Sequence, residues 1–305
     1  MPFSLDKLLV IGISSRALFD LEVEEKIYQE QGLDAYRLHQ LQHENEVLKP
    51  GAGFPLVKAL LRLNQLTPDK RLVEVVIMSR NSSETSLRIF NSIEHYGLDI
   101  SRAALAGGAS LSPYLKAFNV SLFLSLHEDD VQAAINSGTA AALLYRTPEA
   151  AADPEQIRIA FDGDAVLFSD EAERIYQTGG IEAFEKHERE NAKKPLPEGP
   201  FARLLLAISY LQNNFKSDDP HAMPLRTALV TARSSPAHER VIRTLRAWDI
   251  RIDETFFMGG VSKAAVLAAF QPHMFFDDQH GHCLSASGVV PTGRVPYKQA
   301  QSDSH

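Results

Sequence analysis

The segment that decides the fold runs from Arg158 to Asp170 and reads R-I-A-F-D-G-D-A-V-L-F-S-D. An apolar run, Ile159–Phe161, leads directly into Asp162, Gly163 and Asp164, and a second apolar run follows. A buried strand that ends in two carboxylates is costly unless a cation neutralises them. A divalent ion such as Mg²⁺, which takes one or two carboxylates together with phosphate and water, would do so. We therefore expect this strand to carry the nucleophile of a phosphoryl-transfer site.

The composition is that of a globular protein, and the net charge argues against binding to a nucleic acid polymer. The 305 residues are 44% hydrophobic and 23% charged, and the net charge of −8 does not provide the basic face that nucleic-acid phosphates require. The single cysteine, Cys283, rules out an internal disulfide and fits a reducing compartment. The apolar stretch Leu8–Ile13 is too short for a membrane span. We expect a cytoplasmic protein without a membrane segment; a homo-oligomer is one of the states left open.

Apolar runs that alternate with helical patterns predict an α/β fold with a mainly parallel sheet. In the first half, the expected strands are Leu8–Ile13, Val73–Met78, Phe118–Leu124 and Ala140–Leu144. The expected helices of this half are Glu22–Gln42, Pro55–Asn64, Ser86–Tyr96 and Glu128–Asn136.

The second half of the chain repeats the first. Ser14–Arg37 placed on Asp162–Glu185 gives 7 identities in 24 positions, and Val76–Leu126 placed on Ala228–Asp278 gives 11 in 51. Self-similarity at a fixed offset indicates a repeated structural unit. The expected parts are a first domain over residues 1–150, a linker within Pro148–Pro154, a second domain over residues 151–290 and a C-terminal tail over residues 291–305.

The two halves differ at the polar ends of their strands. Only Thr231 keeps a hydroxyl partner, Ser79. The other pairs are Asp162 with Ser14, Asp164 with Arg16, Lys263 with Leu111, Asp277 with Ser125, and Asp278 with Leu126. Ligands of open α/β sheets bind at the carboxyl ends of the strands. The second half is therefore expected to carry the chemistry, and the first to be structural, regulatory or a source of substrate contacts.

Four short motifs follow apolar runs in a fixed order in the second half. They are Asp162-Gly163-Asp164, then Thr231, then Lys263 after Gly259–Ser262, and last Asp277-Asp278. This order resembles that of the haloacid-dehalogenase-like (HAD-like) phosphohydrolases. The resemblance implies two Rossmann-type HAD-like repeats, of which the C-terminal one is catalytic, with a helical cap-like insertion over about residues 169–216.

The motifs are more narrowly similar to those of the cytosolic type I 5′-nucleotidase family. The similarity lies in A-F-D-G-D-A-V-L-F-S-D-E, V-T-A-R-S-S-P, F-F-M-G-G-V-S-K and F-F-D-D-Q, and it extends to S-R-N-S and H-Y-G-L-D-I in the first half. What this resemblance implies is Mg²⁺-dependent removal of the 5′-phosphate from a nucleoside 5′-monophosphate.

The expected catalytic roles follow from chemistry as well as from this resemblance. Asp162 would be the nucleophile that forms an aspartyl-phosphate, and Asp164 the general acid and then the base for water. Thr231 would hydrogen-bond a phosphate oxygen, and Lys263 would offset the charge on phosphate and nucleophile. The substrate-binding residues would be Thr231, Ala232, Arg233 and Lys263. The metal ligands would be Asp162, Asp164 (through its backbone carbonyl, by resemblance), Asp277 and Asp278.

Several other interpretations remain open at this stage. Asp162-Gly163-Asp164 could form a hairpin turn, and Arg233 could pair with a surface acid rather than grip substrate. The group His280, His282 and Cys283 lacks the second ligand pair of a structural zinc site and is expected to lie in a loop beside the active site. The charged run His187–Asn191 is expected to be a solvated helix face. As whole-protein alternatives, the chain could act on another small phosphate monoester or be a non-catalytic nucleotide-binding regulator.

Overall fold

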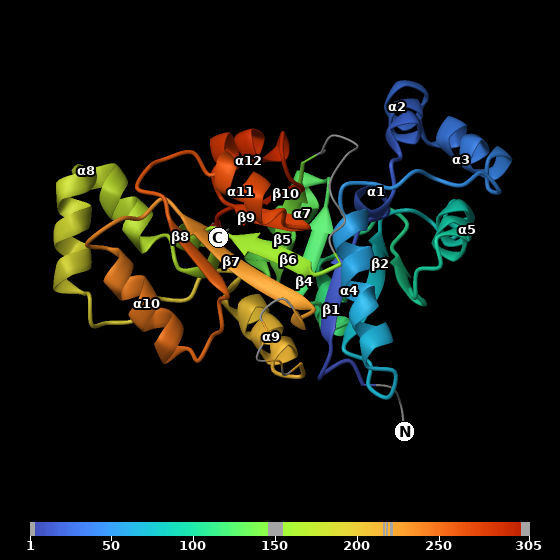
Figure 1. Ribbon diagram of the computed structural model, residues 1–305. Coiled ribbons are helices and arrows are strands. Elements are labelled where there is room, and N and C mark those ends of the chain that lie inside the picture. Colours follow the sequence, from blue (N-terminus) through green and yellow to red (C-terminus); the bar gives the residue numbers. More distant parts are fainter. Residues whose placement is uncertain (1–3, 146–154, 216, 218, 220–221, 300–305) are drawn as a thin grey trace. The chain divides into compact units, whose positions relative to one another are not determined.

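The computed structural model describes residues 4–145, 155–215, 217, 219 and 222–299. The chain divides into two compact units, Met1–Arg146 (unit 1) and Thr147–His305 (unit 2), and each is described by itself (Figure 1). The predicted linker Pro148–Pro154 lies outside the described residues. Within the described ranges, no helix combines the length and the apolar character needed to cross a membrane.

Unit 1 is built on a parallel sheet whose strands lie in the order β3-β2-β1-β4-β5. The strands are β1 Leu9–Ile13, β2 Val73–Ser79, β3 Arg102–Leu105, β4 Leu122–Ser125 and β5 Ala140–Leu144. The central strand β1 is fully buried, and its Ile11 is in register with Val75 on one side and Leu122 on the other. A strand buried on both faces reads as a continuous apolar run, which is why β1 was predictable.

Helices cover this sheet and carry most of the differences from the prediction. They are α1 Ser15–Leu18, α2 Glu22–Gln31, α3 Leu33–Gln42, α4 Phe54–Leu66, α5 Leu87–His95, α6 Ser112–Ala117 and α7 Glu128–Asn136. The single helix predicted over Glu22–Gln42 is wrong, because Gly32 has φ 84° and separates α2 from α3. The strand predicted from Phe118 is also wrong at its start, since Asn119 has φ 52° and the strand begins only at Leu122.

Unit 2 has a parallel sheet with strands in the order β8-β7-β6-β9-β10. The strands are β6 Ile157–Phe161, β7 Leu225–Thr231, β8 Glu254–Phe257, β9 Met274–Asp277 and β10 Thr292–Arg294. Matched in chain order, this is the strand order of unit 1. β10 falls within the predicted tail and pairs with β9, so the tail expected from residue 291 contributes a strand to the sheet.

One or more helical elements connect each strand of unit 2 to the next. They are the π-type turn η1 Gly163–Leu167 and the helices α8 Glu171–Glu190, α9 Ala202–Gln212, α10 His238–Ala247, α11 Ala264–Phe270 and α12 His280–Ser287. Phe161 of β6 and Phe276 of β9 pack against Phe201, with ring centroids 6.5 and 5.0 Å from it. Phe201 immediately precedes α9, whose apolar side chains are mostly buried, so α9 belongs to the core of unit 2.

One hydrogen bond between a loop and a helix recurs in both units. The backbone N–H of Leu48 donates to Ser92 Oγ at 3.0 Å in unit 1, and that of Leu196 donates to Thr244 Oγ1 at 2.9 Å in unit 2. Each hydroxyl in turn donates to a backbone carbonyl of its own helix. The two units therefore share this loop attachment as well as the strand order.

Candidate active site

The carboxyl ends of β6, β7 and β9 bring together residues that lie far apart in the sequence. Asp162 follows β6, Thr231 ends β7 and Asp277 ends β9, and all three are buried. Neighbouring parallel strands end at the same edge of a sheet, which places these side chains at one site. The backbone N–H of Asp162 donates to the carbonyl of Phe276 at 2.7 Å, which joins the ends of β6 and β9.

Three of the predicted metal ligands form a carboxylate cluster. Oxygen atoms of Asp162, Asp277 and Asp278 lie within 4.8 Å of one another, and all three residues are buried. Oδ1 of Asp278 is buried and has no hydrogen-bond partner among the described residues. Buried carboxylates repel one another and need a cation, and oxygen-only donor sets suit hard divalent ions. The residues therefore fit a divalent cation.

Lys263 lies against this cluster at the start of α11. Its Nζ is 2.9 Å from Asp162 Oδ1 and 2.6 Å from Asp277 Oδ2. Burial favours the neutral amine, but the charges of Asp162 and Asp277 outweigh it and raise the pKa of Lys263. The lysine is thus a permanent positive charge beside the expected nucleophile.

Burial controls the protonation of the cluster. It raises the pKa of Asp162 to about 8 and that of Asp278 to about 6, and neighbouring carboxylates add to both shifts. Asp277 behaves differently: burial opposes ionisation, but a hydrogen bond from His282 and the charge of Lys263 lower its pKa. Without a cation, the raised pKa of Asp162 favours one retained proton in the cluster at neutral pH, and a bound cation would replace it.

The turn after β6 gives Asp162 and Asp164 different surroundings. A Cβ on Gly163 would lie 3.2 Å from Thr231 Oγ1, so a larger residue there would push against the end of β7. Two residues later, Ala165 has φ 58°, a left-handed conformation that costs a non-glycine residue roughly 1–3 kcal/mol. The hairpin interpretation of Asp162-Gly163-Asp164 is wrong, because the segment joins β6 to the π-type turn η1.

Asp164 is held by Arg233. Nε and Nη2 of Arg233 donate to the two carboxylate oxygens at 2.8 and 2.7 Å. The third arm of the guanidinium donates to Glu188 of α8, which also accepts from Arg240 Nη1 at 2.8 Å. The Glu188 side chain is 0% exposed, so the expectation that this charged run is a solvated helix face is wrong at Glu188. Ala232, beside Arg233, is exposed in the loop after β7.

Two further residues of the site were not predicted as participants. The O–H of Tyr297 donates to Asp278 Oδ2, and His282 Nδ1 lies 3.3 Å from Asp277 Oδ2. His280, His282 and Cys283 are in helix α12 rather than in a loop. The spacing of His282 from the acidic pair was a usable signal, whereas Tyr297 lies in a polar segment with no local pattern that points to the site.

Fold and site together define an α/β protein with a buried carboxylate and lysine cluster suited to a divalent cation. A sequence profile of the 5′-nucleotidase family matches residues 1–302. Over 286 residues the chain is 40% identical to cytosolic 5′-nucleotidase 1B of Homo sapiens. The aligned segment covers 91% of this chain and 47% of that protein. No solved structure matches. The chain belongs to the cytosolic type I 5′-nucleotidase family, as its motifs predicted, and spans about half the length of this relative.

Proposed function

We propose that this protein hydrolyses nucleoside 5′-monophosphates to nucleoside and phosphate, with Mg²⁺ as cofactor and an aspartyl-phosphate on Asp162 as intermediate. Family membership supports the substrate class. The observation that carries the mechanism is the position of Asp162, which contacts Lys263 at 2.9 Å and shares a carboxylate cluster with Asp277 and Asp278. This is the environment that a carboxylate nucleophile needs in order to approach an anionic phosphate.

In the first step, an oxygen of Asp162 forms a bond to phosphorus while the bond from phosphorus to the ribose 5′-oxygen breaks. Asp164, as the carboxylic acid, donates its proton to that leaving oxygen. In the second step, the Asp164 carboxylate takes a proton from water, and the water oxygen attacks phosphorus. The bond from phosphorus to Asp162 then breaks, which releases phosphate and restores both carboxyl groups.

The remaining residues prepare the site for these steps. Lys263 and Thr231 would stabilise the charge on the phosphate oxygens, the first as a cation and the second as a hydroxyl donor. Mg²⁺, held by Asp162, Asp277, Asp278 and the carbonyl of Asp164, would reduce repulsion between nucleophile and phosphate. Arg233 donates to both oxygens of Asp164. One of these bonds is given up when that oxygen carries the proton for the leaving group, and the other keeps Asp164 in place. Ala232 would bind substrate through the backbone of its loop.

The architecture proposed with this function is a tandem of two HAD-like repeats, over residues 1–150 and 151–290, of which the second is catalytic. The shared strand order and the shared loop attachment support it. Of the cap-like insertion over about residues 169–216, only α8 remains a candidate cap, since α9 is core. Because the relative is described as cytosolic, the cytoplasm is the proposed location.

The test is phosphate release from a panel of nucleoside 5′-monophosphates and other small phosphate monoesters. Release from the nucleotides with Mg²⁺, and none in EDTA or with Asp162→Asn, is the expected result. Asp249→Asn is a matched control, because Asp249 is exposed in a turn where its φ of 53° suits asparagine equally well. An active Asp162→Asn enzyme would overturn the mechanism. Preference for other monoesters would overturn the substrate class, and tight nucleotide binding without release would favour a regulator.

A further inference from the structure

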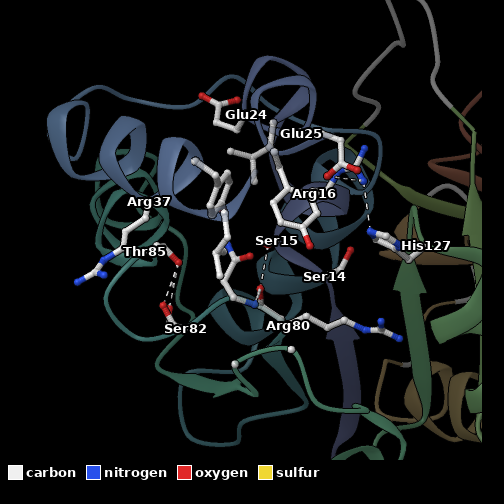
Figure 2. A pocket seen from close by; sticks show the side chains of 18 of the residues that line it. Ser14, Ser15, Arg16, Glu24, Glu25, Arg37, Arg80, Ser82, Thr85 and His127 are labelled. Atoms are coloured by element: carbon white, nitrogen blue, oxygen red, sulfur yellow. Dashed lines mark hydrogen bonds and ion pairs between the residues drawn. The ribbon is translucent and has the colours of Figure 1, made fainter. Parts of the chain in front are cut away.

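Unit 1 contains a cavity of about 500 Å³ at the carboxyl ends of its strands. Its walls include side chains that follow β1 and β2 and side chains of α2 and α3 (Figure 2). The volume falls in the range of small-molecule sites, and the carboxyl edge of an open parallel sheet is where such sites form. The cavity lies within unit 1 and shares no residue with the carboxylate cluster of unit 2.

The side of the cavity formed by the ends of β1 and β2 carries serine hydroxyl groups. Unit 2 has the proposed nucleophilic carboxylate and a threonine at the equivalent positions. Ser14 occupies the position of Asp162, and Ser79 that of Thr231. Ser79 Oγ and Ser15 Oγ are 3.1 Å apart, and Ser14 Oγ accepts a hydrogen bond from the backbone N–H of Ala17 at 3.2 Å. Within the described residues, the Ser14 hydroxyl hydrogen makes no bond, so it can be donated to an anionic oxygen.

The cavity is not built for a metal. The positions equivalent to the metal ligands and the lysine of unit 2 are Ser125, Leu126 and Leu111. Among the described residues, the group of carboxylates suited to a cation is in unit 2 and includes none of the residues of this cavity. An oxyanion bound here would therefore be held by hydroxyl and guanidinium donors alone.

Arg16 and Arg80 supply the guanidinium groups, in positions where unit 2 has Asp164 and Ala232. Arg16 contacts Glu22 at 3.4 Å, Glu25 at 3.1 Å and His127 at 3.3 Å, and Arg80 Nε donates to Asp130 at 2.9 Å. A guanidinium has five N–H donors, so each arginine can keep its carboxylate and still contact a phosphate. Three arginines and four carboxylates line the cavity, so the lining carries no net positive charge, which disfavours a polyphosphate and leaves a single phosphate as the anion to be held.

Two tyrosines stand among the charged and apolar side chains of the wall formed by α2 and α3. Tyr28 and Tyr36 lie edge to face with ring centroids 6.0 Å apart. Tyr28 is 50% exposed, and both rings line the cavity. A planar ring system can pack on such a wall, whereas inorganic phosphate would leave it unused. The cavity thus offers hydroxyl and guanidinium donors for an anion at its strand-end side and two tyrosine rings on the opposing helices.

We propose that unit 1 binds a nucleoside monophosphate without metal and without hydrolysing it. The phosphate lies on Ser14, Ser79 and the two arginines, and the base packs on Tyr28 and Tyr36. The lack of a nucleophilic carboxylate at Ser14 leaves the phosphate ester intact. This binding is separate from the hydrolysis proposed for unit 2, and it persists in a protein whose catalysis has failed.

The test is calorimetric titration of the full chain in EDTA with adenosine 5′-monophosphate, adenosine and inorganic phosphate. The expected result is one nucleotide bound per chain. Adenosine and inorganic phosphate should each bind with an affinity at least about tenfold lower. Tyr28→Ala should weaken nucleotide binding about tenfold or more, as expected for loss of a ring contact. Arg80→Gln tests the part of the cavity proposed to hold the phosphate. It should weaken binding of the nucleotide but not of adenosine.

Tyr176→Ala is the matched control, since Tyr176 occupies the position of Tyr28 in the other repeat and is 49% exposed. It should leave metal-free binding unchanged. Equal affinity for adenosine and nucleotide would overturn the phosphate assignment. No binding in EDTA, or binding lost with Tyr176→Ala and kept with Tyr28→Ala, would overturn the proposal. Circular dichroism checks that each variant is folded.

Discussion

Both carboxylate oxygens of Asp164 lie on the guanidinium of Arg233, at 2.8 and 2.7 Å. The same guanidinium reaches Glu188 on α8, so one arginine joins the turn after β6 to a helix elsewhere in unit 2. Arg233 is 4% exposed and fully charged. Each of its three guanidinium nitrogens already donates to a carboxylate, so in the proposed mechanism Arg233 positions the general acid.

Replacing this guanidinium should lower turnover more than substrate affinity. Arg233→Lys keeps a charge but loses the two-pronged contact, so kcat should fall about 10- to 100-fold with little change in KM. Steady-state phosphate release measures both constants. The control is Arg243→Lys on α10, whose arginine forms an exposed pair with Glu239. A raised KM at unchanged kcat would show that Arg233 grips substrate instead.

We expect Glu188 to contribute to the folding stability of unit 2. Its side chain is fully buried between Arg233 and Arg240, so Glu188→Gln leaves two buried cations undercompensated. Losing one partner of a buried ion pair costs about 3–5 kcal/mol of unfolding free energy. Urea unfolding measures it. Glu190→Gln, two residues further on the same helix and exposed, should change stability by less than about 1 kcal/mol. Equal effects of the two substitutions would contradict the buried network.

The carboxylate cluster should make stability of the metal-free protein depend on pH. The pKa of Asp162 is raised by burial from 3.8 to about 8 in the folded state. Between these values the folded state binds more protons than the unfolded state, so this contribution to stability is lost as pH rises. In EDTA, wild-type stability should fall relative to Asp162→Asn from about pH 5 to pH 8.

Binding of Mg²⁺ at neutral pH should release a proton from the same cluster, because the cation replaces it. Calorimetry in buffers of different ionisation enthalpy measures the proton count. Asp162→Asn is again the reference, since its amide carries no titrating proton. Two results would contradict the assignment of the raised pKa to Asp162. One is a wild-type stability that rises with pH relative to Asp162→Asn, and the other is metal binding without proton release.

Gly199 should tolerate no side chain. A Cβ there would lie 2.3 Å from the carbonyl oxygen of Phe168 and 2.6 Å from that of Val166, and backbone cannot move aside cheaply. Gly199→Ala should lower the unfolding free energy by about 1–3 kcal/mol. Gly281→Ala on α12 is the control, because open space surrounds it and alanine should be neutral or mildly stabilising there. Thermal melting of both variants checks this difference.

The parts of the fold that were predictable are those whose sequence pattern matches their burial. β1 is buried on both faces and is a continuous apolar run, and β2 and β6 are mainly apolar, interrupted by Glu74 and Arg158. β3 and β8 are half-buried edge strands of mixed composition, and neither was predicted. β10 has three residues, Thr292–Arg294, which is too short for a periodic pattern.

The candidate site divides along similar lines. Asp162, Thr231, Lys263 and Asp277 each follow an apolar run or a glycine turn, so their order along the chain indicated a common site. Glu188 lies in a charged helical stretch, where sequence does not distinguish a buried acid from a solvated one. Tyr297 contacts Asp278 from 19 residues away, and such a contact depends on tertiary packing alone.

The uncharged residues at the strand ends of unit 1 limit how a charged site could arise there. Ser14, Ser125 and Leu111 are all buried, at the positions of Asp162, Asp277 and Lys263. Ser125→Asp or Leu111→Lys alone would bury a charge without the partner that Asp277 and Lys263 give each other in unit 2, at a cost of several kcal/mol. A compensated pair of charges would require both changes together. In the proposed tandem of repeats, a charge gained at Ser125 or Leu111 alone would therefore lower the stability of unit 1 before it could contribute to a second catalytic centre.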